Sequence, residues 1–237
     1  ITRCSPDGGV LETEGGRRLA VSKAWDWGKE RSPIWLEPCE ESYYLAARWI
    51  GMGCETLLDL GCGLGRHAIH FARQGFRVSA FDLSEEGTAH LRDWAGRERL
   101  DIDVKTADMQ RLPYPDGAFD CVFAFHVISH TDTAGLRAVL SEIGRVLKKG
   151  GEVFLTLCSK ETWSFREAGY PRLDGNTVVK TGGGPEDGVP HVFVELDEIP
   201  ELFAGFTLLR IRHTDDCWFD GRRQSSKHYF LLARRPL

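Results

Sequence analysis

Short apolar segments alternate with longer amphipathic segments between residues 55 and 158, and this alternation restricts the possible fold more than any other feature of the sequence. The apolar segments have the length of strands, and the longer ones repeat apolar side chains at the i, i+3, i+4, i+7 spacing of a buried helical face. Strands are predicted at 55–60, 76–82, 102–108, 119–125 and 151–158, and helices at 65–74, 85–97 and 133–148. Repeated strand–helix–strand units predict an α/β fold with a mainly parallel sheet and helices on both faces.

The C-terminal part departs from this alternation. Strands are predicted at 206–213 and 227–234 with no helix between them, which indicates an antiparallel end to a sheet of seven strands. Residues 159–194 form an insertion, or cap, between the fifth strand and a helix predicted at 196–204. We therefore expect an N-terminal arm at 1–37 and one domain at 38–237.

Composition excludes several classes of protein. The 237 residues carry a formal net charge of −5, which argues against bulk electrostatic binding to nucleic acid or to an anionic membrane. No apolar run approaches the roughly 20 residues of a membrane-spanning helix, and the N-terminus has no apolar secretory core. The seven cysteines are scattered without a C-x-x-C pair, so we expect a reducing, cytoplasmic environment and no structural zinc site.

A glycine-rich loop follows the first predicted strand in the segment LLDLGCGLGRH. Gly61, Gly63 and Gly65 allow a tight turn and a close approach of the backbone to a ligand at the start of the next helix. The spacing is G-x-G-x-G, whereas a dinucleotide fingerprint requires G-x-G-x-x-G and position 66 is Arg66. Asp59, in the strand before the loop, is better suited to a cationic group such as an ammonium than to a pyrophosphate.

Two more carboxylates end the next two predicted strands. Asp82 stands where an acidic residue can accept both hydroxyls of a ribose, and Asp108 ends the third strand. Ligands of open α/β sheets bind at this carboxyl edge. Each residue also has a purely structural interpretation, since glycines form turns and a strand-end aspartate often caps a helix. The joint spacing of the loop, Asp82 and Asp108 favours the functional interpretation.

These motifs resemble those of the class I S-adenosylmethionine-dependent methyltransferases that act on small molecules. The matching segments are LDLGCGLGRH, AFDLSEEG, ADMQRLPYPDGAFDCVFAFHVISH and LSEIGRVLKKGGEVFLTL, within residues 38–158. The resemblance implies a Rossmann-like fold, S-adenosyl-L-methionine as the cofactor and a small-molecule methyl acceptor, and it says nothing about the identity of that acceptor.

The resemblance also implies roles for individual residues. Gly61, Gly63 and Gly65 would wrap the methionine part of the cofactor, while Asp59 would face its amino group.

The nucleoside part falls to the later strand ends. Asp82 would hold the ribose diol with Leu83 beside the adenine, and Asp108 would accept a hydrogen bond from the adenine amine. The backbone N–H of Met109 would meet the ring. Phe125 would direct its backbone carbonyl toward the methionine ammonium.

Methyl transfer from a sulfonium needs alignment of the reacting atoms and exclusion of water more than it needs acid–base groups. His126 and His130 follow the fourth strand, where this family places its acceptor, and are the candidate general bases. His191, at the end of the insertion, is a candidate substrate-binding residue. His126 also has a structural interpretation as a packed or capping residue, and His130 as a solvated one. The spacing of the histidines does not indicate a metal site.

The arm carries Trp25, Trp27 and Trp35, which either close over the cofactor or pack on the edge of the sheet. We expect an enzyme that moves a methyl group to an O, N, S or C nucleophile of a small molecule. A nicotinamide-dependent oxidoreductase and a non-catalytic cofactor-binding module are the alternatives. The oligomeric state is not indicated.

Overall fold

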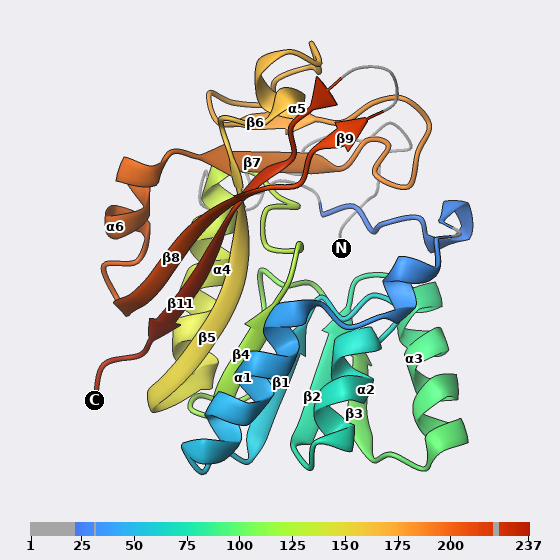
Figure 1. The fold of residues 1–237 in the computed structure, drawn as a ribbon, viewed down its shortest axis with the longest axis vertical. Coiled ribbons are helices and arrows are strands. Elements are labelled where there is room, and N and C mark those ends of the chain that lie inside the picture. Colours follow the sequence, from blue (N-terminus) through green and yellow to red (C-terminus); the bar gives the residue numbers. More distant parts are fainter. Residues whose placement is uncertain (1–21, 31, 220–222) are drawn as a thin grey trace, which may run out of the picture.

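The computed structural model describes residues 22–30, 32–219 and 223–237. Its main sheet contains the seven predicted strands in the order β3-β2-β1-β4-β5-β11-β8 (Figure 1). Their bounds are β1 Thr56–Leu60, β2 Arg77–Asp82, β3 Ile102–Thr106, β4 Phe119–Ala124, β5 Leu147–Ser159, β8 Thr207–Asp215 and β11 Lys227–Arg234. Strands β3, β2, β1, β4 and β5 run parallel to one another. Strand β11 is antiparallel to both β5 and β8, as the sequence predicts.

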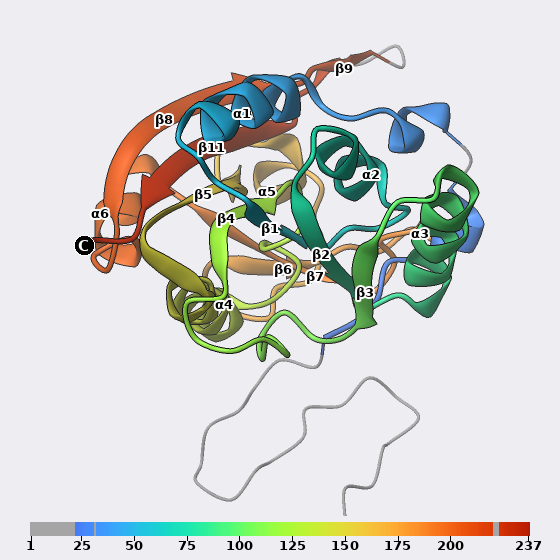
Figure 2. The same ribbon diagram turned by 90° about the horizontal axis from the view of Figure 1, so that it is seen from below.

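Helices cover both faces of the sheet, in agreement with the prediction (Figure 2). One face is packed by α1 Glu40–Gly51, α2 Arg66–Arg73 and α3 Glu85–Glu98, and the other by α4 Thr133–Val146 and α6 Ile199–Leu202. The alternation of side chains along β1 explains the two cores, because Leu57 packs under α1 and α2 whereas Leu58 and Leu60 pack under α4. Burial of both faces requires the nearly continuous apolar strands that the sequence shows.

Two helices differ from their predicted bounds. The helix predicted at 133–148 ends at Val146, because Leu147 already has extended backbone and begins β5. The helix predicted at 196–204 is a 3₁₀ turn, η3 Leu196–Glu198, followed by the single turn of α6.

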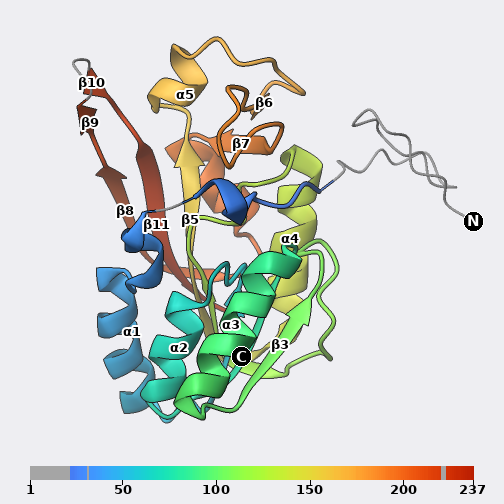
Figure 3. The same cartoon turned by 90° about the vertical axis from the view of Figure 1, so that its right-hand side faces the viewer.

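The insertion adds strands that the sequence analysis did not predict. It contains α5 Trp163–Arg166, β6 Thr177–Val179 and β7 Pro190–Val194. β7 pairs in parallel with the end of β5 and in antiparallel with β6, so the sheet has nine strands in total. The insertion therefore extends the sheet above its carboxyl edge (Figure 3). A separate ribbon of β9 Trp218–Phe219 and β10 Arg223–Gln224 lies beyond β8.

Of the predicted N-terminal arm, residues 1–21 and 31 lie outside the described residues. The remainder contains two 3₁₀ turns, η1 Trp27–Lys29 and η2 Pro33–Leu36. The backbone N–H of Asp26 donates to the carbonyl of Pro185 at 3.1 Å, so the arm is attached to the insertion. Within the described residues, the helices are too short or too polar to cross a membrane.

Candidate functional site

The glycine loop joins β1 to α2 at the carboxyl edge of the sheet. Gly61, Gly63 and Gly65 have φ of 72°, 51° and 100°, in the left-handed region that favours glycine. The loop is also too crowded for side chains, since a Cβ at Gly61 would lie 2.1 Å from a methyl carbon of Val127. The three glycines are thus required by backbone conformation, which explains the motif whether or not a ligand binds.

Asp82 ends β2 and connects this loop to the neighbouring strand. Its Oδ2 accepts a hydrogen bond from the N–H of Gly63 at 2.9 Å, and its Oδ1 accepts one from the N–H of Ser84 at 2.8 Å. Burial raises the pKa of Asp82, and these backbone N–H groups oppose that rise. Each carboxylate oxygen can accept a further hydrogen bond, so both remain able to bind a diol.

Asp59 is buried in β1 beneath the loop, with 1% of its surface exposed. Its Oδ2 has no hydrogen-bond partner among the described residues, and burial raises its pKa to about 7. A buried carboxylate oxygen without a partner is costly in an empty site and becomes favourable when a cation approaches. This orphaned oxygen fits the amino group of S-adenosylmethionine.

Asp108 and Met109 lie in the loop between β3 and β4. Oδ1 of Asp108 accepts a hydrogen bond from the N–H of Gln110 at 2.8 Å, an arrangement that shapes the turn and leaves Oδ2 for a ligand. The side chain of Met109 is buried in the core under α4. Leu83, directly after β2, is partly exposed.

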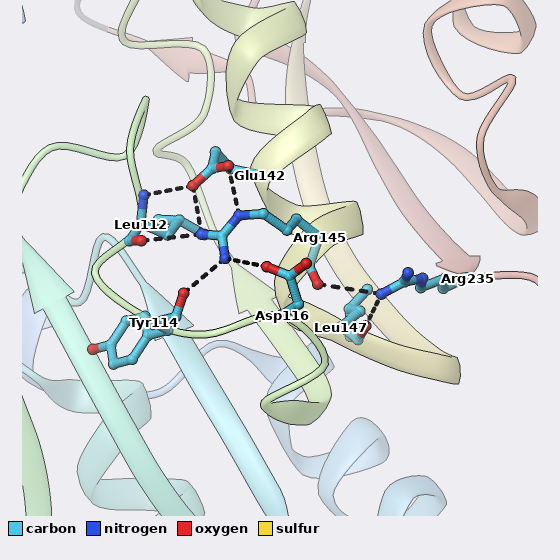
Figure 4. A network of polar contacts seen from close by, with 7 residues as sticks. All are labelled: Leu112, Tyr114, Asp116, Glu142, Arg145, Leu147 and Arg235. Atoms are coloured by element: carbon cyan, nitrogen blue, oxygen red, sulfur yellow. Dashed lines mark hydrogen bonds and ion pairs between the residues drawn. The ribbon is translucent and has the colours of Figure 1, made fainter.

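Arg145 of α4 makes several polar contacts with this loop (Figure 4). Its guanidinium donates to the carbonyls of Leu112 and Tyr114 at 3.1 and 2.8 Å. It also pairs with the carboxylates of Glu142 and Asp116 at 2.7 and 2.9 Å. One planar side chain thus connects α4 to three points of the loop, at Leu112, Tyr114 and Asp116, and it positions the loop that carries Asp108.

Phe125 is partly buried one residue after β4. Its ring is stacked near those of Phe123 and Phe230, with centroids 6.3 and 5.9 Å away, and the guanidinium of Arg66 lies over it at 5.7 Å. The side chain therefore has a packing role, and any contact with the cofactor is left to the backbone.

The tryptophans of the arm lie on the glycine loop and on His130. Trp27 is so close to Gly63 that a Cβ on the glycine would lie 2.5 Å from its ring. Trp25 stacks on His130 with centroids 5.8 Å apart, and Trp35 contacts both other tryptophans. The indole N–H groups of Trp25 and Trp27 are buried and have no partner among the described residues.

His126 follows β4 with φ of 54°, an uncommon conformation for a residue other than glycine. Its N–H donates to Oγ1 of Thr156 at 2.7 Å, and its ring lies 4.3 Å from that of His228. Burial lowers the pKa of His126 well below its usual range and that of His228 to about 4. Both rings are therefore neutral near pH 7.

His130 and His191 are brought together by the fold, with ring centroids 4.6 Å apart. Burial lowers the pKa of His130 to about 3 and also lowers that of His191. Nε2 of His191 lies 2.9 Å from Oε1 of Glu186. Sequence reasoning named the two histidines separately and missed Glu186, because no spacing along the chain indicates this contact.

Comparison with known proteins finds similarity over the part of the chain that carries the glycine loop. A family model described as "Methyltransferase domain" matches residues 57–151, from β1 into β5. Over this segment the chain is similar to the class I S-adenosylmethionine-dependent methyltransferases. Among its relatives, a sterol 24-C-methyltransferase of Gibberella zeae is 35% identical over 98 residues, which are 40% of this chain and 25% of the relative. A ubiquinone biosynthesis O-methyltransferase of Caulobacter vibrioides is 35% identical over 106 residues, which are 44% of this chain and 41% of the relative.

A solved structure of a methyltransferase from Methanosarcina mazei shares the fold with a TM-score of 0.65 at 18% identity, covering 77% of this chain and 93% of that one. The chain spans less than half the length of the two curated relatives. The methyltransferase match includes the glycine loop, Asp82 and Asp108, but the arm and the insertion lie outside it.

Proposed function

We propose that this chain transfers a methyl group from S-adenosylmethionine to a small-molecule acceptor. The observation that carries the proposal is the bond from the N–H of Gly63 to Asp82, because it joins the glycine loop and the expected ribose ligand in one rigid unit. The match of residues 57–151 to the methyltransferase model supports S-adenosylmethionine as the cofactor and favours methyl transfer over the nicotinamide-dependent alternative.

The residues that we propose to hold the cofactor surround this unit. Asp82 accepts the ribose hydroxyls, and Asp59 accepts the cofactor amino group with its unpartnered oxygen.

On the nucleoside side, Asp108 and the N–H of Met109 bind the adenine, and Leu83 packs beside it. The backbone carbonyl of Phe125 completes the binding of the ammonium. The bound cofactor supplies an activated methyl carbon.

The chemistry at the acceptor falls to the side chains above β4. His126 and His130 are neutral near pH 7 and each can accept a proton, although their low pKa values make them weak bases. Such bases are adequate for a thiol or an amine, which lose a proton readily. His191 lies beside His130 and is the proposed substrate contact. The acceptor atom remains open, since the relatives include C- and O-methyltransferases.

The direct test is titration with S-adenosylhomocysteine by calorimetry, comparing wild type with Asp82→Ala. We expect the variant to bind at least about tenfold more weakly, because the ribose hydroxyls lose a charged acceptor. Asp103→Ala, which removes an exposed aspartate of β3, is the matched control and is expected to bind as wild type does. Absence of binding by wild type at millimolar ligand would contradict the proposal.

A non-catalytic cofactor-binding module is the second candidate, and it predicts tight binding with no methylated product in any acceptor screen. The nicotinamide alternative predicts enhanced NADH fluorescence on mixing. Both measurements are made on the same preparation, so they separate the three functions directly.

We also propose that the protein works in the cytoplasm. The six described cysteines are all free, as expected for a reducing compartment. Fractionation of the native source, with immunodetection of this chain, tests this location.

A further inference from the structure

Three side chains with metal-binding atoms meet between β4 and β7. His130 follows β4, Glu186 lies in the loop before β7, and His191 is in β7. Their ligand atoms all lie within 4.8 Å of one another. A tetrahedral ion with bonds of 2.0–2.1 Å places its ligands roughly 3.3 Å apart, so small rotations of these side chains suffice for coordination.

His191 carries the strongest evidence. Its Nδ1 lies 3.0 Å from the carbonyl of Val189, and its Nε2 lies 2.9 Å from Oε1 of Glu186. Both partners are acceptors, whereas a neutral imidazole has one N–H to donate. A single proton cannot serve both contacts, and when it lies on Nδ1 the lone pair of Nε2 faces a carboxylate. A cation between Nε2 and Oε1 resolves this conflict, and an imidazole N–H bonded to a carbonyl is the usual support of a metal-bound histidine.

Glu186 is held in the orientation of a ligand. Its Oε2 pairs with the ammonium of Lys180 at 2.6 Å, which leaves Oε1 directed at His191. Carboxylates that bind metals are commonly fixed in this way by a second hydrogen bond. Lys180 also compensates part of the cost of burying this carboxylate near two neutral rings.

His130 completes the group. Its ring is fixed by the stack with Trp25 and by its contact with His191. Among the described residues no group is hydrogen-bonded to either of its ring nitrogens, so a nitrogen is available to an ion. The backbone bond from Asp26 to Pro185 places the arm next to Glu186.

From these contacts we propose that His130, Glu186 and His191 bind a divalent transition-metal ion of the Zn²⁺ type. Two histidines and one carboxylate leave a coordination position open to water or to an oxygen or sulfur of a substrate. The site stands on these three side chains, and with an ion bound to His130 the proposed role of base falls to His126 alone.

A second group, His126, His228 and Asp216, also gathers two imidazoles and a carboxylate. Asp216 is exposed, and no described contact directs its carboxylate at the two rings. This group therefore serves as a comparison in the test rather than as a second proposal.

The test is titration of the chelator-treated chain with Co²⁺, followed by calorimetry and by the visible absorption of the bound ion, and then displacement with Zn²⁺. Wild type is expected to bind one equivalent. Glu186→Gln and His191→Gln are expected to weaken Co²⁺ binding at least about 100-fold, since each removes a direct ligand. Asp216→Asn and His213→Gln, which leave the three ligands intact, are expected to bind Co²⁺ as wild type does.

His130→Ala disturbs no hydrogen bond of the His130 ring among the described residues. Its Co²⁺ binding tests the site if the Glu186 and His191 variants fail to fold. Loss of the absorption in this variant, with an unchanged circular dichroism spectrum, supports the site. Failure of wild type to bind Co²⁺ or Zn²⁺ at millimolar concentration would overturn the proposal. Retention of binding in Glu186→Gln, or its loss in Asp216→Asn alone, would overturn it as well.

Discussion

The indole of Trp27 fills the space beside Gly63, where a Cβ on the glycine would lie only 2.5 Å from the ring. The same indole lies against Gly87 in the first turn of α3, so that two glycines form the notch that receives it. The arm is thereby docked on the loop that we propose to hold the cofactor. A buried aromatic side chain in such a notch contributes on the order of 2 kcal/mol.

We therefore predict that Trp27→Ala releases the arm from the loop and weakens binding of S-adenosylhomocysteine about tenfold, because the cofactor loses an apolar cover. Calorimetric titration measures the change. Trp94→Phe, which alters a partly buried tryptophan of α3 bonded to Glu98, is the control and is expected to bind normally. Tighter binding by Trp27→Ala would show instead that the indole obstructs the pocket.

From the raised pKa of Asp59 we predict an unusual pH dependence of the free energy of unfolding. Burial raises its pKa from an ordinary value of 3.8 to about 7, so the native state holds a proton that the unfolded chain has already lost. The protonated carboxyl of Asp59 makes its full contribution to the free energy of unfolding below about pH 4. This contribution, roughly 4 kcal/mol, is lost as the pH rises to 7. Asp59→Asn removes this loss, and the variant should gain stability relative to wild type between pH 5 and pH 8 in urea unfolding.

Asp120 provides the control of opposite sign. Burial raises its pKa, but hydrogen bonds from Lys148 and Thr56 outweigh this and hold it below its usual range. Asp120→Asn should therefore be less stable than wild type at pH 8, and the difference should shrink only as the pH falls through about 4. If Asp59→Asn shows the same pH trend as Asp120→Asn, the raised pKa of Asp59 is wrong.

The sequence predicts those parts of the site whose residues belong to one strand and the loop that follows it. Asp59 and Asp82 lie at the ends of adjacent parallel strands, because strand–helix–strand units bring their carboxyl ends to one edge. The contact of Glu186 with His130 and His191 could not be predicted in this way. It depends on the pairing of β7 with β5, and the short segment Pro190–Val194 lies among glycines and prolines that suggest a loop.

Because Arg145 connects α4 to the loop that carries Asp108, we predict that its loss weakens cofactor binding. Arg145→Met should remove the bonds to the carbonyls of Leu112 and Tyr114, lower the free energy of unfolding by about 2 kcal/mol and weaken binding of S-adenosylhomocysteine, because the loop carrying Asp108 loses its support. Arg137→Met, on the same helix with only an exposed pair to Glu201, is the control. Unchanged cofactor affinity in Arg145→Met would show that the loop is held by its other contacts.

Glu152 of β5 predicts a large effect on stability far from the site. Its carboxylate is fully buried and accepts bonds from Arg48 at 2.8 and 2.9 Å, from Arg234 at 2.8 Å and from the indole of Trp49 at 3.0 Å. These three partners connect α1 and β11 to the middle of the sheet. Burial raises the pKa of Glu152, but the hydrogen bonds outweigh it and leave the pKa lowered.

Glu152→Gln should lower the free energy of unfolding by about 3 kcal/mol at pH 7, since two arginines and an indole lose a charged acceptor while both guanidiniums keep some access to water. Because the pKa is lowered, the contribution is present above about pH 4.5 and is lost below it, so the difference from wild type should diminish in acid. Glu98→Gln breaks the surface pair with Arg73 and should lower the free energy of unfolding far less than Glu152→Gln does, because solvent screens this pair. Equal losses in the two variants, measured by urea unfolding, would mean that burial adds nothing to the Glu152 network.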